Sequence, residues 1–248
     1  MNLQNVFSVA SKDFETYKRK KSIVGYTLGL PLIMATAFSF IVQSQIATTA
    51  QGGVNPPGQL NLGMLSLTYL FVVFGAILPT SIAAYSIVGE KVEKSLEPML
   101  ATPLTESEIL LGKTVAALVP SILTTWLGAS IFMAASDSVL LGPIGYYYFP
   151  NWTAGVVLFL LLPLAELLGV EVAVIASSRI GDVRGANQLG GLIWLPFMTV
   201  FIAGVEGAFD FTAENFVIFA GILAAIEVGL FFVSTSTFNR EQILTRWK

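Results

Sequence analysis

The sequence predicts an all-α membrane protein with six transmembrane helices, an N-terminal amphipathic interfacial helix and both termini in the cytoplasm. The first observation behind this prediction is the composition. Of the 248 residues, 54 % are apolar and only 12 % are charged, against about 25 % charged in an ordinary soluble domain. Such a chain has too few polar side chains to cover a soluble fold, whereas a membrane protein has lipid as its outer solvent. The other observations are six apolar stretches and the placement of the basic residues.

The six apolar stretches each reach or approach the roughly 20 residues that a helix needs to cross the hydrocarbon core of a bilayer. The first is too long for a cleaved signal peptide, and no small-residue cleavage pattern follows it. The fifth is the shortest and is interrupted by Pro196. The predicted spans are 23–46, 62–88, 111–136, 152–176, 188–206 and 215–237.

The basic residues fall on one side of the membrane if these six spans alternate in direction. All 13 Lys and Arg residues precede span one, lie between or beside spans two and three, lie between spans four and five, or follow span six. The positive-inside rule makes that side cytoplasmic, so both termini are predicted inside. The outer side is predicted to hold Asp137, Glu206, Asp210, Glu214 and an aromatic belt of Tyr146, Tyr147, Tyr148 and Trp152.

The residues before span one predict an amphipathic helix over 3–20. Apolar residues recur at three- and four-residue spacing from Leu3 to Tyr17, and polar residues such as Asp13 fill the other face. A helix of this kind, ending in a basic run, tends to lie in the cytoplasmic membrane interface. We therefore divide the chain into an elbow helix over 1–22, a transmembrane domain over 23–237 and a cytoplasmic tail over 238–248.

The predicted cytoplasmic connection between spans two and three is charged and patterned, reading GEKVEKSLEPMLATPLTESEILLGKT over residues 89–114. Thr105 and Glu108 form a predicted capping box that starts the third membrane helix. Acidic residues in the first turn of that helix suit its dipole. Pro98 and Pro103 interrupt any helix that continues from span two. The predicted shape is a helix leaving the membrane, a turn, and a new helix entering.

Gly112-Lys113-Thr114 imitates the end of a phosphate-binding loop. Such a loop would need its first glycine at position 107, which is Ser107, and it follows a strand. We therefore expect no nucleotide site here, and we expect Lys113 to anchor at the lipid headgroups.

The same connection resembles the ABC-2 type permeases, the membrane subunits of one class of ATP-binding-cassette (ABC) exporter. In that family an acidic stretch joins the second and third spans. The chain has Lys94-Ser95 where the family often has Gly-Thr, and the stretch 177–196 between spans four and five also fits the family. The matching residues are Glu90, Lys91, Leu96, Glu97, Pro98, Leu100, Ala101, Thr102, Pro103, Glu108, Ile109, Leu110, Gly112 and Lys113.

The resemblance implies that two copies of the chain pair around a central pathway, and that each binds a separate ABC ATPase subunit. ATP and Mg would be bound by that partner, with no cofactor and no metal on this chain. The expected partners are thus ABC ATPase subunits, a second copy and the bilayer of the cell membrane, and no nucleic acid. The residues implied in ATPase coupling are Glu90, Glu93, Glu97, Pro98, Leu104, Thr105, Glu106 and Glu108.

Three acids fall within predicted spans: Glu166 and Glu171 in span four, and Glu227 in span six. An ionised acid near the bilayer centre costs about 2.5–3.5 kcal/mol on insertion scales, so it usually faces protein or water. We expect Glu166 and Glu227 at similar depths, with Glu171 about 7.5 Å closer to the cytoplasm. Each is a candidate for lining the transport pathway and contacting a cation. The other interpretation is a protonated acid hydrogen-bonded between helices or, for Glu171, a pair with Arg179.

The sequence contains neither Cys nor His, which excludes thiol chemistry and removes the commonest general base and metal ligand. We therefore expect a transport subunit and not an enzyme, with ATP hydrolysis on a partner chain. The substrate of this predicted ATP-driven exporter is either an amphipathic, lipid-like or drug molecule or a small cation such as sodium. An ion-coupled secondary transporter is the alternative, which explains the membrane acids but leaves the 89–114 pattern unexplained.

Two smaller features are open. Gly25 and Gly29 have the spacing of a close helix contact, either within the chain or at a dimer interface. The segment 204–214 is either a plain loop or a re-entrant helix pair.

Overall fold

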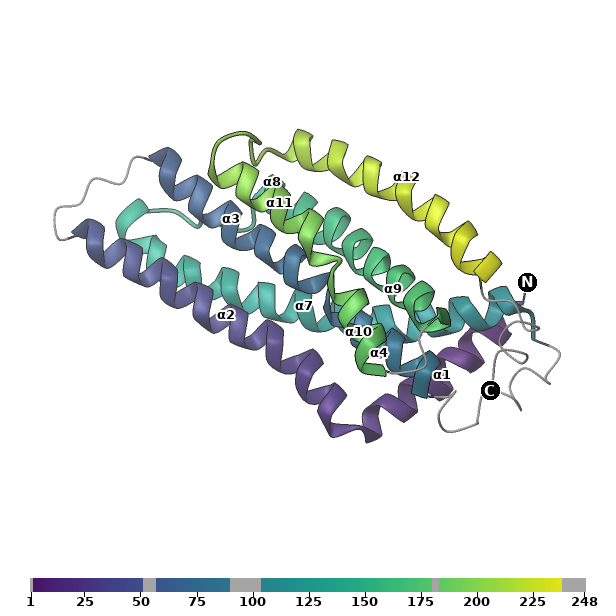
Figure 1. Cartoon of the computed structure of the whole chain (residues 1–248). Coiled ribbons are helices and arrows are strands. Elements are labelled where there is room, and N and C mark those ends of the chain that lie inside the picture. Colours follow the sequence, from purple (N-terminus) through teal and green to yellow (C-terminus); the bar gives the residue numbers. More distant parts are fainter. Residues whose placement is uncertain (1, 51–56, 90–103, 180–182, 238–248) are drawn as a thin grey trace.

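The computed structural model of the protein describes residues 2–50, 57–89, 104–179 and 183–237. In these ranges all regular structure is helical, and the helices form a bundle (Figure 1). Six segments are long and apolar enough to cross a membrane, which confirms the predicted all-α class and the number of spans. The six are Lys21–Ala47, Leu60–Ala84, Ser107–Ile144, Trp152–Ser177, Asn187–Val205 and Ala213–Val233.

The first two helices meet at a sharp bend. Helix α1 (Leu3–Arg19) begins at Asn2, whose side chain accepts a hydrogen bond from the backbone N–H of Gln4 at 3.1 Å. Lys20 is extended and ends α1, and α2 (Lys21–Ala50) follows at once. Figure 1 shows the start of α1 and the end of the last helix at the same end of the bundle, which we call the α1 end.

The second span is broken into three pieces: α3 (Pro57–Gly75), α4 (Leu78–Ala84) and the π-helical turn η1 (Tyr85–Gly89). Its break admits a neighbouring helix, because a Cβ atom at Gly169 would lie only 2.1 Å from the carbonyl oxygen of Ala76. Glycine at position 169 is therefore required for this close approach.

The third span is a single helix, α7 (Glu106–Ile144), of 39 residues. It is longer than the predicted 111–136 at both ends. A Cβ atom at Gly128 would lie 2.7 Å from the carbonyl oxygen of Pro31, so α7 and α2 touch backbone to backbone there. Asp137, predicted in an outer loop, lies instead inside α7 and is buried. It is buried because its carboxylate accepts the N–H groups of residues 148 and 149, at 2.9 and 3.1 Å, and so fixes the turn after α7.

The fourth span consists of α8 (Trp152–Val156), the π-helical segment η2 (Val157–Leu161) and α9 (Leu162–Arg179). Pro163 has no N–H to donate to the preceding turn. The carbonyl of Leu158 instead accepts a hydrogen bond of 2.8 Å from the indole N–H of Trp126 on α7.

The fifth span is split into α10 (Val183–Gly191) and α11 (Trp194–Val205), with the break just before Pro196. The last helix, α12 (Ala213–Thr237), forms the sixth span. Between α11 and α12, residues 206–212 form a plain loop without a helix of their own, so the segment 204–214 is not a re-entrant pair.

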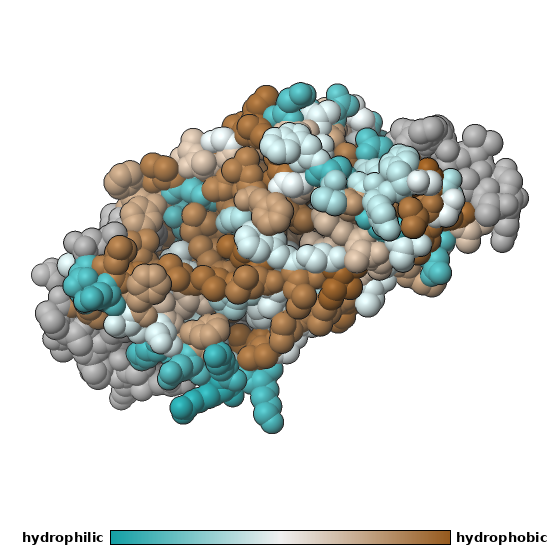
Figure 2. Space-filling view, turned by 180° about the vertical axis from the view of Figure 1, so that it is seen from behind, coloured by the Kyte–Doolittle hydropathy of each residue, from teal (hydrophilic) through white to brown (hydrophobic). Residues whose placement is uncertain are grey.

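The surface and the core agree with a membrane protein. Figure 2 shows hydrophobic residues over the middle of one face and hydrophilic residues gathered where α1 joins α2. The rings of Phe38, Phe71 and Phe132 pack together in the core. A Cβ atom at Gly25 or Gly29 would meet nothing within 4 Å, so these glycines make no close helix contact with the residues that the structure describes.

Candidate coupling site and acidic pocket

The predicted coupling residues divide into two groups. Glu90, Glu93, Glu97 and Pro98 lie outside the described residues. Leu104 and Thr105 lie just before α7, Glu106 is its first residue, and Glu108 is in its first turn. The structure therefore describes the end of the predicted coupling segment that leads into α7.

The capping box at the start of α7 is confirmed. The hydroxyl of Thr105 accepts the N–H of Glu108 at 3.3 Å, and the carboxylate of Glu108 accepts the N–H of Thr105 at 3.1 Å. Two of the N–H groups that a helix start leaves without partners are thereby satisfied.

The same carboxylate also holds α1. It accepts the backbone N–H of Asn2 at 2.6 Å and the side-chain amide of Asn5 at 3.1 Å. A negative charge at this position also suits the positive ends of both helix dipoles. Glu108 thus joins the starts of two helices that lie more than 100 residues apart in the sequence.

One turn further along α7, a buried ion pair makes a second link to α1. The ammonium group of Lys113 lies 3.3 Å from the carboxylate of Asp13, and both side chains are almost fully buried. Lys113 also donates to the hydroxyl and carbonyl oxygens of Ser86 in η1, at 2.9 and 3.2 Å. The hydroxyl of Ser86 donates in turn to Asp13 at 2.7 Å, and Tyr17 adds a longer bond of 3.4 Å.

Two predictions are therefore wrong: Lys113 does not anchor at the headgroups, and Asp13 does not lie on an exposed polar face. Both are buried because α1 packs directly on α7, where a Cβ atom at Gly112 would lie 2.6 Å from the Cβ of Val9. A charge in such a contact requires a partner of opposite sign and further hydrogen bonds. We call these linked residues the α1 polar cluster: Asn2, Asn5, Asp13, Ser86, Glu108 and Lys113.

Glu166 lies elsewhere, between the helices of the bundle. It is fully buried, and one carboxylate oxygen accepts the hydroxyl of Thr125 on α7 at 3.0 Å. The other oxygen has no hydrogen-bond partner within the described residues. A Cβ atom at Gly75 would lie 3.3 Å from Glu166, so α3 closes this site from a third side.

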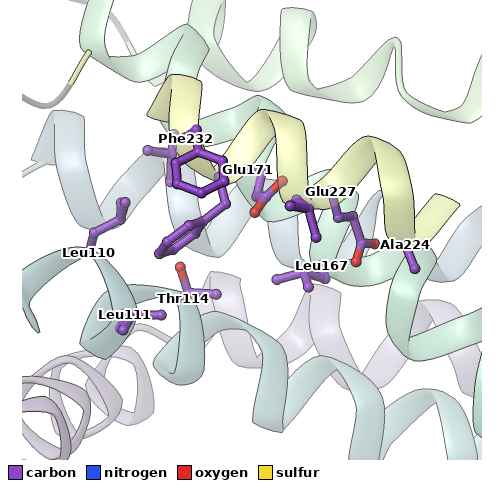
Figure 3. Close-up of a pocket in the computed structure, with 11 residues that line it drawn as sticks. Leu110, Leu111, Thr114, Leu167, Glu171, Ala224, Glu227 and Phe232 are labelled. Carbon is purple, nitrogen blue, oxygen red and sulfur yellow. The ribbon is translucent and has the colours of Figure 1, made fainter. Parts of the chain in front are cut away.

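Glu171 and Glu227 share a cavity of about 380 Å³ between α7, α9 and α12. Figure 3 shows the two carboxylates, one from α9 and one from α12, among apolar side chains. Each is 5 % exposed, and Oε2 of Glu171 and Oε1 of Glu227 have no hydrogen-bond partner among the residues described. We call this cavity the acidic pocket. The side chain of Arg179, the predicted partner of Glu171, lies outside the described residues.

The acidic pocket is almost entirely apolar apart from these acids and one hydroxyl. In the part of the chain that the structure describes, no three Asp or Glu side chains come together as a metal site would need. The lining residues are Leu110, Leu111, Thr114, Leu167, Glu171, Val174, Ala224, Glu227, Val228, Phe231 and Phe232.

Comparison with known protein families decides the class of this six-span chain. The model of the ABC-2 family transporter protein matches residues 7–242, nearly the whole length. The chain belongs to the ABC-2 transporter family. No curated protein matches it individually.

Family membership makes this chain a multi-pass membrane protein and the permease subunit of an ABC transporter. ABC-2 permeases normally pair with ABC ATPase subunits, so the chain is a transport subunit and not the ATPase.

Several residues of this ABC-2 permease could not be singled out from its sequence. Asp13 and Ser86 carry no local signal, because their partner Lys113 is 100 and 27 residues away. The shared pocket of Glu171 and Glu227 depends on how α12 is rotated against α9, which sequence spacing along either helix does not determine.

Proposed function

We propose that this ABC-2 permease forms, as a pair of copies in the cell membrane, the substrate pathway of an ATP-driven exporter. In this proposal the ATPase subunit acts on the segment between spans two and three. The substrate is either an amphipathic molecule or a small cation.

The observation that carries the proposal is the double attachment of α1 to both flanks of that segment. Ser86 lies shortly before the segment and belongs to the α1 polar cluster through Asp13 and Lys113. Glu108 lies shortly after it and holds Asn2 and Asn5 of α1. A displacement imposed on 90–103 therefore reaches the end of span two, the start of span three and α1 together.

The proposed orientation places the α1 end in the cytoplasm. Exposed basic residues gather there, including Lys18, Arg19 and Lys21, as the hydrophilic surface in Figure 2 illustrates. Lys20 lies over the ring of Tyr85, 3.6 Å from its centre, so a cation–π contact adds to the attachment of the α1–α2 bend to span two. The excess of basic residues agrees with the positive-inside rule.

The proposed pairing of two copies is supported by α2. Gly25 and Gly29 are open on its surface, and large apolar side chains such as Ile33 and Phe40 are exposed beside them. Small residues allow helix backbones of two chains to approach closely in a membrane.

The coupling proposal is tested by neutralising the acidic segment. The triple variant Glu90→Gln/Glu93→Gln/Glu97→Gln is expressed in the source organism and purified through an affinity tag. We expect the Mg-ATP hydrolysis that co-purifies with it to be at least tenfold lower than with the wild type. The reason is that the docking surface loses its charges while the membrane bundle is untouched. Mass spectrometry identifies the co-purified ABC ATPase subunit.

A matched control removes three acids from the opposite end: Glu206→Gln/Asp210→Asn/Glu214→Gln should retain full ATP hydrolysis. Undiminished hydrolysis in the segment variant would contradict the coupling proposal. Transport by the chain alone in proteoliposomes, driven by an ion gradient, would instead support the secondary transporter.

A further inference from the structure

The acidic pocket combines a buried, incompletely bonded pair of acids with an apolar cavity whose α12 wall includes side chains exposed on the outside of the bundle. We propose that it binds an amphipathic organic cation, an ammonium group carried on an apolar body, which enters sideways from the inner leaflet. As a substrate site this inference rests on the proposed function and orientation; as a binding site it stands on the geometry alone.

The two carboxylates provide the recognition of charge. Glu171 and Glu227 come from different helices, face the same cavity, and each keeps an oxygen without a hydrogen-bond partner among the described residues. Leaving buried polar groups unsatisfied is costly, and more so when they are charged. An ammonium group supplies both the opposite charge and the missing N–H donors.

The remaining walls provide a surface for an apolar body. Leucine, valine and alanine side chains cover most of the cavity, and the neighbouring rings of Phe231 and Phe232 form one side. The volume of about 380 Å³ falls within the range of about 300–1,000 Å³ that is common for small-molecule sites. The aromatic faces also attract cations.

The same composition argues against an inorganic cation. Hard cations take about six or more oxygen ligands in a compact shell. Besides Glu171 and Glu227, the described residues add only the hydroxyl of Thr114 to the polar lining. Of the two substrate classes left open above, the pocket therefore favours the amphipathic one.

The position of the pocket gives the route of entry. Val228 and Phe232, on the α12 wall, are 60 % and 68 % exposed on the outside of the bundle. Glu227 is about 21 Å from the start of α12 and about 15 Å from its end, and Glu171 is about 12 Å from the end of α9. Both acids thus lie nearer the α1 end, at the depth of the inner leaflet in the proposed orientation.

The test measures binding of radiolabelled 4-phenylbutylammonium to the full chain in nanodiscs of phosphatidylcholine, with 4-phenylbutanol as the neutral analogue. We expect saturable binding of the ammonium compound and at least tenfold weaker binding of the alcohol. We expect the double variant Glu171→Gln/Glu227→Gln to lose at least tenfold in affinity for the ammonium compound. Asp210→Asn/Glu214→Gln, which also removes two acids, should bind as the wild type does.

The proposal is overturned if the wild type shows no saturable binding, as expected if a second copy covers the pocket. It is also overturned if the alcohol binds equally well, as expected for a lipid-filled groove. The proposal is likewise overturned if Glu171→Gln/Glu227→Gln has a normal gel-filtration profile and still binds the ammonium compound as the wild type does. Should that variant fail to fold, the comparison of ammonium and alcohol on the wild type still decides.

The outcome is separable from the coupling proposal. The pocket variant Glu171→Gln/Glu227→Gln should co-purify with the ATPase normally, and the segment variant Glu90→Gln/Glu93→Gln/Glu97→Gln should bind the ammonium compound normally. If the segment variant loses the ATPase subunit but still binds the ammonium compound, both inferences stand. If it keeps the ATPase subunit and still binds the ammonium compound, only the coupling proposal is overturned.

Discussion

The α1 polar cluster and the acidic pocket both bury ionisable side chains in a chain that has few of them, but the hydrogen bonding of these side chains differs between the two regions. In the cluster, Lys113 has a carboxylate and two oxygens of Ser86 around its ammonium group, and Glu108 accepts hydrogen bonds from both helix starts. In the pocket, Glu171 and Glu227 face apolar walls, and each retains an oxygen without a partner among the described residues.

This difference indicates a structural role for the α1 polar cluster and agrees with the ligand-binding role proposed for the acidic pocket. A matched pair whose hydrogen bonds are filled from its own chain fixes one arrangement of helices, and it loses stability when either partner is removed. A pair of acids with unfilled oxygens costs stability as it stands, and buried acids of this kind within a membrane bundle are candidates for ligand sites.

Lys113→Met should have the largest effect and tests the first half of this comparison. The substitution keeps the length of the side chain but leaves Asp13 buried without its cation, which costs about 3–5 kcal/mol. The free energy of unfolding, measured by SDS titration, should fall by that amount. The double variant Asp13→Asn/Lys113→Met should recover a substantial part of the loss. A single variant as stable as the wild type would show that the pair does not hold α1.

Gly112→Ala should have a smaller effect at the same interface. Its new Cβ would lie 2.6 Å from the Cβ of Val9, and overpacking of this kind costs about 1–3 kcal/mol. Gly221→Ala on α12 is the matched control, because a Cβ there meets nothing within 4 Å among the described residues. Equal SDS stability of the two variants would argue that α1 is only loosely attached to α7.

Glu171→Gln and Glu227→Gln should have the smallest effect on stability and the opposite sign. Each replaces a buried, incompletely bonded acid by a neutral amide, so the free energy of unfolding should rise by about 1 kcal/mol. The readout is the same SDS titration, beside the loss of ammonium binding expected above. A loss of stability as large as that of Lys113→Met would mean that these acids are structural, and the contrast between the two regions would disappear.

Structural features that depend on residues close together in the sequence were predicted correctly. The six apolar stretches correspond to the six spans, and Thr105 with Glu108 forms the expected capping box, because both patterns depend on residues within one or a few turns. The helix over residues 3–20 was predicted for the same reason, and α1 occupies Leu3–Arg19.

Features that depend on distant partners were not predictable in this way. Helical periodicity assigned Asp13 to a polar face, but the periodicity of one helix cannot reveal that Lys113 approaches it from another. The sequence predicts Asp137 outside the span because a charge usually ends a span, whereas the N–H groups of the following turn satisfy it within the helix. The predicted depth of Glu227 was wrong: spacing along the spans placed it level with Glu166, whereas it shares a pocket with Glu171. The faces that Glu171 and Glu227 present could not be predicted from spacing at all.

The 39-residue length of α7 has a mechanical consequence. Such a helix is about 58 Å long, almost twice the thickness of the hydrocarbon core. Its backbone contact at Gly128 and Pro31 divides it into arms of about 33 and 24 Å. We expect α7 to pivot about this contact. Displacement of the arm that carries Lys113 then moves the other arm, which carries Asp137, in the opposite direction. A pivot at Gly128 would thus couple opening of the helix bundle on one face of the membrane to its closing on the other face.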